Sequence, residues 1–224
     1  MKYKILVFDL DDTLIDNREN VRTAFRRMLE VEKRDYSDEE FERWYRIDRK
    51  FWSDWRNGLV AIPERFSKED QYNKSDEYHD WIRAQRLIIF FDNKISEERA
   101  IELNNIYMAA MSETIIPIDG ATETLRYLHE RDYTIIVATN GPDRATQHKI
   151  DCIGASDYVT EILAADAISC MKPDPFFFTA IEKRYGDFDK TDYLMIGDSL
   201  KSDVGFSMNV GIDSCWLDRG GWRK

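Results

Sequence analysis

The feature that most constrains the fold is a short apolar run that ends in acidic residues. Residues 3–8 read Tyr-Lys-Ile-Leu-Val-Phe, and Asp9 and Asp11 follow at alternate positions. An apolar run of this length is typical of a strand that is buried on both faces of a parallel sheet. Open α/β sheets bind their ligands at the carboxyl ends of such strands. The pattern therefore predicts an α/β fold with two carboxylates at a ligand-binding edge.

Three later segments place further polar residues near the ends of apolar runs. They are VATNG at 137–141, MKPDP at 171–175 and IGDSLKSD at 196–203. Thr139 and Asp198 each close an apolar run, while Lys172 and Asp203 follow in loops or at a helix start. Singly, such residues are more often helix caps, turn formers or solvated loop lysines. Their joint occurrence in this order, together with Asp9, favours a single reaction site.

The residue types suit phosphoryl transfer. A carboxylate can act as a covalent nucleophile and form an aspartyl-phosphate, and we expect Asp9 in that role. Asp11 could protonate the leaving group and then activate the hydrolytic water. Attack of one anion on another needs charge compensation, for which Mg²⁺ with oxygen ligands is the usual solution. Asp198 would supply a further ligand oxygen, and Asp203 would orient the metal or its waters from outside the coordination sphere.

The transferred phosphoryl group also needs hydrogen-bond donors and positive charge. Thr139 offers a hydroxyl, and the main chain at Asn140 and Gly141 can approach the phosphate closely. Lys172 offers a point charge. We therefore predict a phosphate-binding set of Thr139, Asn140 and Lys172.

Taken together, the four segments resemble the motifs of the haloacid dehalogenase (HAD) superfamily. Those motifs are DxDxT, a Ser or Thr that closes the second strand, a Lys, and an acidic pair of the GDxxxxD type. The resemblance extends over nearly the whole chain. It implies that Asp9 and Asp11 are the catalytic residues and that Thr139 and Lys172 bind phosphate. It further implies a metal site formed by Asp9, the Asp11 carbonyl and Asp198, with Asp203 in support.

A long stretch after the first motif has helical periodicity. Apolar stripes are formed by Val21, Phe25, Met28 and Leu29 and by Phe41, Trp44, Tyr45, Trp52 and Trp55. A capping box at Ser37 and Glu40 precedes the second stripe, and Asn57-Gly58 is a natural stop. The HAD superfamily calls such an insertion a type 1 cap. We predict a mainly α-helical cap domain over 16–115, which would close over the catalytic loops, exclude water and select the substrate.

The rest of the chain, 1–15 and 116–224, is predicted to form the HAD-like core domain. Further strands are expected at 133–138, 162–165, 193–197 and 212–217, and a helix at 120–131. With the first strand they would make a doubly wound parallel sheet with helices on both faces. In the cap, further helices are expected from residue 63 and over 78–91 and 96–111.

The aromatic residues of the cap give a hint about substrate. Most should pack the helices, but Trp52 or Trp55 could stack on a planar ring. The string FWSDWRNG at 51–58 resembles the pyrimidine nucleoside 5′-monophosphate phosphatase branch of the superfamily. Arg86 on a later helix is a candidate substrate contact, or else a solvated arginine.

Composition narrows the class of partner. The net charge of −11 argues against nucleic acid or an anionic membrane as partner, and leaves a small phosphorylated metabolite. The N-terminal apolar run is too short for a signal peptide or a membrane span. The three cysteines have no metal-ligand spacing, and their odd number suits a reducing compartment. We therefore expect a cytoplasmic protein.

Several functions remain compatible with these residues. We predict a Mg²⁺-dependent phosphatase, with a pyrimidine nucleoside 5′-monophosphate as a candidate substrate. A sugar-phosphate mutase would use the same aspartyl-phosphate, and a non-catalytic phosphate-binding regulatory module would use the same loops. A dehalogenase is disfavoured, because that branch lacks an acid at the position of Asp11 and requires no metal.

Overall fold

The computed structural model describes residues 2–73 and 75–220, and the chain divides into two compact units. One unit is Met1–Arg18 with Ile115–Lys224, and the other is Glu19–Thr114. The sequence prediction placed the corresponding divisions at 15/16 and 115/116. We call the first the core unit and the second the helical unit.

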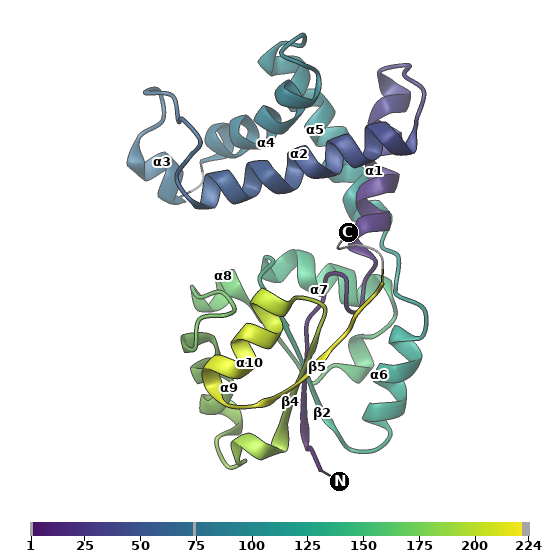
Figure 1. Cartoon of the computed structure of the whole chain (residues 1–224), viewed down its shortest axis with the longest axis vertical. Coiled ribbons are helices and arrows are strands. Elements are labelled where there is room, and N and C mark those ends of the chain that lie inside the picture. The colour runs from purple at the N-terminus through teal and green to yellow at the C-terminus, as the bar shows by residue number, and fades with distance from the viewer. Residues whose placement is uncertain (1, 74, 221–224) are drawn as a thin grey trace. The chain divides into compact units, whose positions relative to one another are not determined.

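The core unit is built on a five-stranded parallel sheet (Figure 1). Its strands are β1 (Ile5–Phe8), β2 (Thr134–Thr139), β3 (Glu161–Ala164), β4 (Tyr193–Gly197) and β5 (Asp213–Trp216). The order in the sheet is β3-β2-β1-β4-β5, so that β1 occupies the centre. This confirms the predicted doubly wound α/β fold. Asp9, the residue after β1, consequently lies in the middle of the carboxyl edge.

Helices cover both faces of this sheet (Figure 1). Alternate residues of β1 pack on opposite sides, as the pleat of a strand requires. Ile5 and Val7 pack with α9 (Phe176–Tyr185) and α10 (Gly205–Val210), whereas Leu6 and Phe8 pack with α6 (Ala121–His129) and α7 (Asp143–Cys152). The short elements between them are α8 (Ala165–Ile168), the 3₁₀ turns η1 (Ser156–Tyr158) and η2 (Lys190–Asp192), and the π-helical turn η3 (Leu200–Val204).

Within its described residues, 19–73 and 75–114, the helical unit is formed by five helices, the first of which begins just before it. They are α1 (Asn17–Val31), α2 (Asp38–Arg56), α3 (Lys68–Asn73), α4 (Asp76–Phe90) and α5 (Glu97–Glu113). The Ser37 hydroxyl accepts the Glu40 N–H at the start of α2, and Gly58, at φ +69°, follows its end. No helix in the described part of the chain has both the length and the apolar character that a membrane span needs.

One predicted helix begins later than the sequence suggested. The sequence favoured a helix from residue 63, but Pro63 to Phe66 forms a turn in which the Phe66 N–H donates to the Pro63 carbonyl. The helix starts at Lys68, because Ser67 and Asp70 form a reciprocal cap in which each side chain accepts the other's N–H. The capping residues, rather than the proline, set this boundary.

Aromatic residues fill the helical unit in two clusters. The larger surrounds Phe25, Trp44 and Phe90, which are fully buried. The smaller contains Phe51, Phe66, Tyr78, Trp81 and Ile82, with Trp52 and Trp55 packed against it. The larger cluster joins helices α1, α2, α4 and α5, so the unit has its own hydrophobic core.

Candidate active site

The first element of the site is an ion pair between Asp9 and Lys172. Lys172 Nζ lies 2.8 Å from Asp9 Oδ1, and the Thr13 hydroxyl donates to Asp9 Oδ2 at 3.3 Å. The Asp9 N–H donates to the Ile196 carbonyl of β4, which fixes the main chain where β1 ends. Lys172 is 3% exposed, so its charge is available only to groups within the site.

Asn140 determines where Lys172 lies. Its side-chain amide donates to the Lys172 carbonyl at 2.9 Å, and its amide oxygen accepts the Lys172 N–H at 2.8 Å. The side chain is therefore engaged with this loop, so the predicted phosphate contact of Asn140 would have to come from its main chain. Beside it, the Thr139 hydroxyl accepts the Gly141 N–H at 3.0 Å.

Asp203 is the second partner of Lys172. Its Oδ1 lies 2.7 Å from Lys172 Nζ, and its Oδ2 accepts the Ser199 N–H at 3.0 Å. Asp203 is 1% exposed and packs directly against Gly197. A Cβ atom at Gly197 would lie 2.3 Å from Asp203 Oδ2, so only glycine allows this approach. Sequence reasoning had not assigned Gly197 any role.

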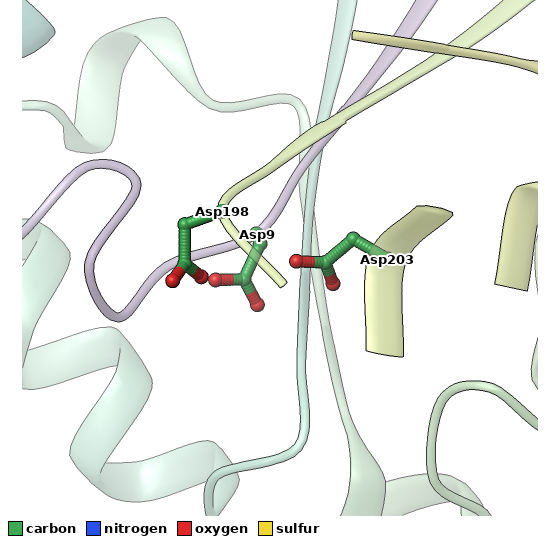
Figure 2. A group of neighbouring side chains, drawn as sticks. All are labelled: Asp9, Asp198 and Asp203. Carbon is green, nitrogen blue, oxygen red and sulfur yellow. The ribbon is translucent and has the colours of Figure 1, made fainter. Parts of the chain in front are cut away.

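Asp198 completes a group of three carboxylates. One oxygen from each of Asp9, Asp198 and Asp203 lies within 4.8 Å of the others, and Figure 2 shows the Asp9 carboxyl group between the other two. The Asp198 N–H donates to the Thr13 hydroxyl at 3.1 Å. Thr13 therefore links the Asp9 loop to the end of β4.

The electrostatics of this group show a surplus of negative charge. Burial raises the pKa of Asp9 to about 7, opposed by Lys172 and reinforced by Asp203. Burial also raises the pKa of Asp12 to about 7, with further contributions from Asp198 and Asp11. Burial acts to lower the pKa of Lys172, but Asp9 and Asp203 outweigh it and raise the pKa above its usual value. An all-oxygen, electron-rich group of this kind fits a hard divalent cation such as Mg²⁺.

Asp11 has a partner that the sequence did not reveal. Its Oδ1 is paired with Lys149 Nζ of α7 at 2.5 Å. The two residues are 138 positions apart in the chain, so no local pattern could connect them. One sequence feature could have suggested the contact. The helix α7 begins just after β2, so one face of the helix lies near the carboxyl edge of the sheet.

Three residues proposed as substrate contacts belong to the helical unit. Trp52 and Trp55 are half-buried and meet edge to face, with ring centroids 5.6 Å apart. Arg86 is different, because it is only 4% exposed. Its guanidinium donates to Asp48, to Asn104 at 2.8 Å and to the Arg83 carbonyl at 3.0 Å. Arg86 is therefore not a solvated arginine, since its donors are engaged by groups of its own unit. Its contact with substrate stays a prediction.

Comparison with known proteins agrees with the site geometry. The profile of the haloacid dehalogenase-like hydrolases matches residues 3–211, and the chain belongs to that family. It is 28% identical to the pyrimidine 5′-nucleotidase PynA of Streptococcus pneumoniae over 97% of this chain and 85% of that protein. It is 25% identical to the pyrimidine 5′-nucleotidase YjjG of Escherichia coli, over 97% and 87%. The predicted enzyme class, a hydrolase of phosphoric monoesters, is thereby confirmed.

A solved structure supports the fold. The magnesium-bound HAD-hydrolase YfnB of Bacillus subtilis superimposes with a TM-score of 0.78 and 22% sequence identity, over 99% of this chain and 90% of that one. At this sequence identity, the structural similarity supports the fold alone.

Proposed function

We propose that this protein is a Mg²⁺-dependent phosphatase that hydrolyses a small phosphomonoester through an aspartyl-phosphate on Asp9. The observation that carries the proposal is the position of the Asp9 carboxylate. It follows the central strand, is held by the buried Lys172, and lies within 4.8 Å of Asp198 and Asp203. A nucleophile with a fixed position and a nearby cation is what in-line attack on a phosphate requires.

In the first half-reaction, a carboxylate oxygen of Asp9 attacks phosphorus and the bond from phosphorus to the leaving oxygen breaks. Asp11 donates its proton to that oxygen. Lys172, the Thr139 hydroxyl and the main chain of Asn140 stabilise the charge on the phosphoryl oxygens. The products of this step are the free alcohol and phosphorylated Asp9.

In the second half-reaction, water attacks phosphorus while Asp11, now a carboxylate, takes a proton from the water. The bond between phosphorus and the Asp9 oxygen breaks, which releases phosphate and restores Asp9. Asp9, Asp198 and the Asp11 carbonyl would hold Mg²⁺, whose charge would offset that of the phosphoryl group. Asp203 acts in support, because both of its oxygens are already engaged by Lys172 and the Ser199 N–H.

For the substrate we propose a pyrimidine nucleoside 5′-monophosphate, and for the helical unit the role of a cap domain that selects it. Two similar proteins named above are pyrimidine 5′-nucleotidases. In the helical unit, Trp52 and Trp55 keep part of their ring surface exposed. An indole face left in this way can stack on a base. We place the enzyme in the cytoplasm, with this metabolite as its partner.

The test is to trap the covalent intermediate. Asp11→Asn should slow hydrolysis of the intermediate, so incubation with Mg²⁺ and p-nitrophenyl phosphate should leave phosphate on the tryptic peptide 5–18, at Asp9 after borohydride reduction. The wild-type enzyme should release phosphate with Mg²⁺ and stop when EDTA is added. Phosphate elsewhere, or turnover unaffected by EDTA, would contradict the proposal. A substrate isomerised without phosphate release would identify a mutase, and no turnover of any phosphate ester a binding module.

A further inference from the structure

The inference concerns Lys149, which none of the motifs includes. We propose that Lys149 is the positioning residue for Asp11, the acid and base of the reaction, while Lys172 serves Asp9. The inference rests on the proposed function, because it assigns Lys149 to one step of that reaction. The two aspartates are two positions apart, yet each is held by a lysine from a different segment.

The contact leaves Asp11 able to act. Lys149 Nζ lies 2.5 Å from Asp11 Oδ1. Among the described residues, 2–73 and 75–220, the Asp11 carboxylate makes this one side-chain hydrogen bond. Oδ2 stays available to give or take the proton. A carboxylate fixed through one oxygen keeps a defined direction for the other, whereas an untethered one would share its time among rotamers.

The lysine itself is well anchored. It lies in the last turn of α7, and the next residue, Ile150, is fully buried in the core. One turn earlier, the buried Thr146 donates its hydroxyl to the Pro142 carbonyl at 2.9 Å. The Lys149 side chain is 17% exposed and that of Asp11 35%, so this pair can be reached from solvent. The Lys172 side chain, in contrast, is 0% exposed.

This division predicts a selective defect. If Lys149 directs Asp11 alone, its loss should slow the steps that need proton transfer and spare attack by Asp9. The value of kcat/KM covers the reaction up to departure of the leaving group. An alkoxide needs the proton from Asp11, whereas p-nitrophenolate leaves without one. Glycerol 2-phosphate and p-nitrophenyl phosphate therefore separate the two roles.

The experiment measures kcat/KM for both esters in wild type, Lys149→Met, Lys149→Arg and Arg144→Gln. For Lys149→Met we expect a loss of about 10- to 100-fold on glycerol 2-phosphate and less than about threefold on p-nitrophenyl phosphate. Lys149→Arg keeps a cation in reach and should restore most of the activity. Arg144→Gln, which removes the same charge from an exposed position of α7, should leave both values unchanged.

Equal losses on the two esters would overturn the inference, since a phosphate ligand or a structural residue affects both alike. A Lys149→Arg enzyme as slow as Lys149→Met would overturn it too. Melting temperatures of all variants show whether a loss comes from unfolding. Failure of the proposed function would look different. In that case the wild-type enzyme would either not turn over the esters, or Asp9→Asn would leave its turnover unchanged.

Discussion

The core unit and the helical unit differ in how far their buried charges are balanced by charges of opposite sign. In the core unit, Asp9 and Asp203 share one buried lysine and Asp198 lies beside them, so the group holds more acidic than basic side chains. In the helical unit, the buried Arg86 meets Asp48 and the amide oxygen of Asn104, and its charge is matched. The comparison teaches that an unmatched buried charge indicates a site for ligand or metal, whereas a matched one indicates structure.

The surroundings of Arg86 support this distinction. Its guanidinium lies 5.1 Å from the ring of Trp52, 5.6 Å from that of Trp44 and 5.8 Å from that of Tyr107. Aromatic faces at these distances stabilise a cation. Burial raises the pKa of Tyr107 above its usual value, with the charge of Asp48 adding to the effect. The Tyr107 hydroxyl therefore stays neutral and adds no charge to the pair.

The largest effect should follow from a change within the acidic group of the core unit. Asp9→Asn should lower kcat by at least about a thousandfold, because the amide cannot form the acyl phosphate. The fold should survive, since Lys172 keeps Asp203 as a partner. The measurement is kcat on p-nitrophenyl phosphate with the melting temperature, and the exposed Asp119→Asn serves as control. A variant that keeps more than about a tenth of the wild-type rate would remove Asp9 from the nucleophile's role.

The matched charge should behave in the reverse manner. Arg86→Met leaves Asp48 without its counter-ion and should cost about 3–5 kcal/mol of stability, the range for breaking a buried pair. Denaturant unfolding followed by fluorescence reports it, because Trp44 and Trp52 lie beside the guanidinium.

The control for this variant is Arg43→Met, which breaks the exposed pair with Asp92 and should cost less than about 1 kcal/mol. If Arg86→Met were equally mild but raised KM, Arg86 would be a substrate contact and the contrast between the units would fail.

A smaller effect is expected at the glycine beneath Asp203. Gly197→Ala would place a Cβ atom 2.3 Å from Asp203 Oδ2, so the Asp203 carboxylate would have to move. That movement would weaken the ion pair by which Asp203 holds Lys172. We expect a loss of roughly 1–3 kcal/mol in stability and about tenfold in kcat. Gly205→Ala is the matched control, since the nearest atom to its Cβ would be the Leu200 carbonyl oxygen at 3.6 Å, an ordinary van der Waals contact. Equal behaviour of the two alanines would show that the contact with Asp203 is not needed.

The smallest effect concerns base recognition. Trp52→Leu or Trp55→Leu should remove a stacking energy of about 0.5–1.5 kcal/mol beyond area burial. That corresponds to a fall of roughly threefold to tenfold in the ratio of kcat/KM for a pyrimidine monophosphate to that for ribose 5-phosphate. Saturated turnover of p-nitrophenyl phosphate should change little. An unchanged ratio in both variants would make these tryptophans packing residues, like the aromatic cluster beside them.

The sequence predicted the core better than the helical unit, for a physical reason. Strand ends in a parallel sheet meet at one edge, so Asp9, Thr139 and Asp198 could be brought together from their order alone. A helical stripe says which residues face inward but not which of them a cation will meet. The burial of Arg86 therefore could not be foreseen, because its partners come from two other helices. Lys149 was missed for the same reason, since its contact spans 138 positions.

The central position of β1 also bears on the order in which the protein folds. The Lys172 contact to Asp9 spans 163 positions, and the Asp198 contact to Thr13 spans 185. During synthesis, β1 emerges first but gains its neighbour β4 only after residue 197. The helical unit, in contrast, is one continuous segment, whose contacts can form while the rest is still being made. We therefore expect the nascent chain to complete its helical unit before it has a site, and to gain its chemistry only when β4 joins the sheet.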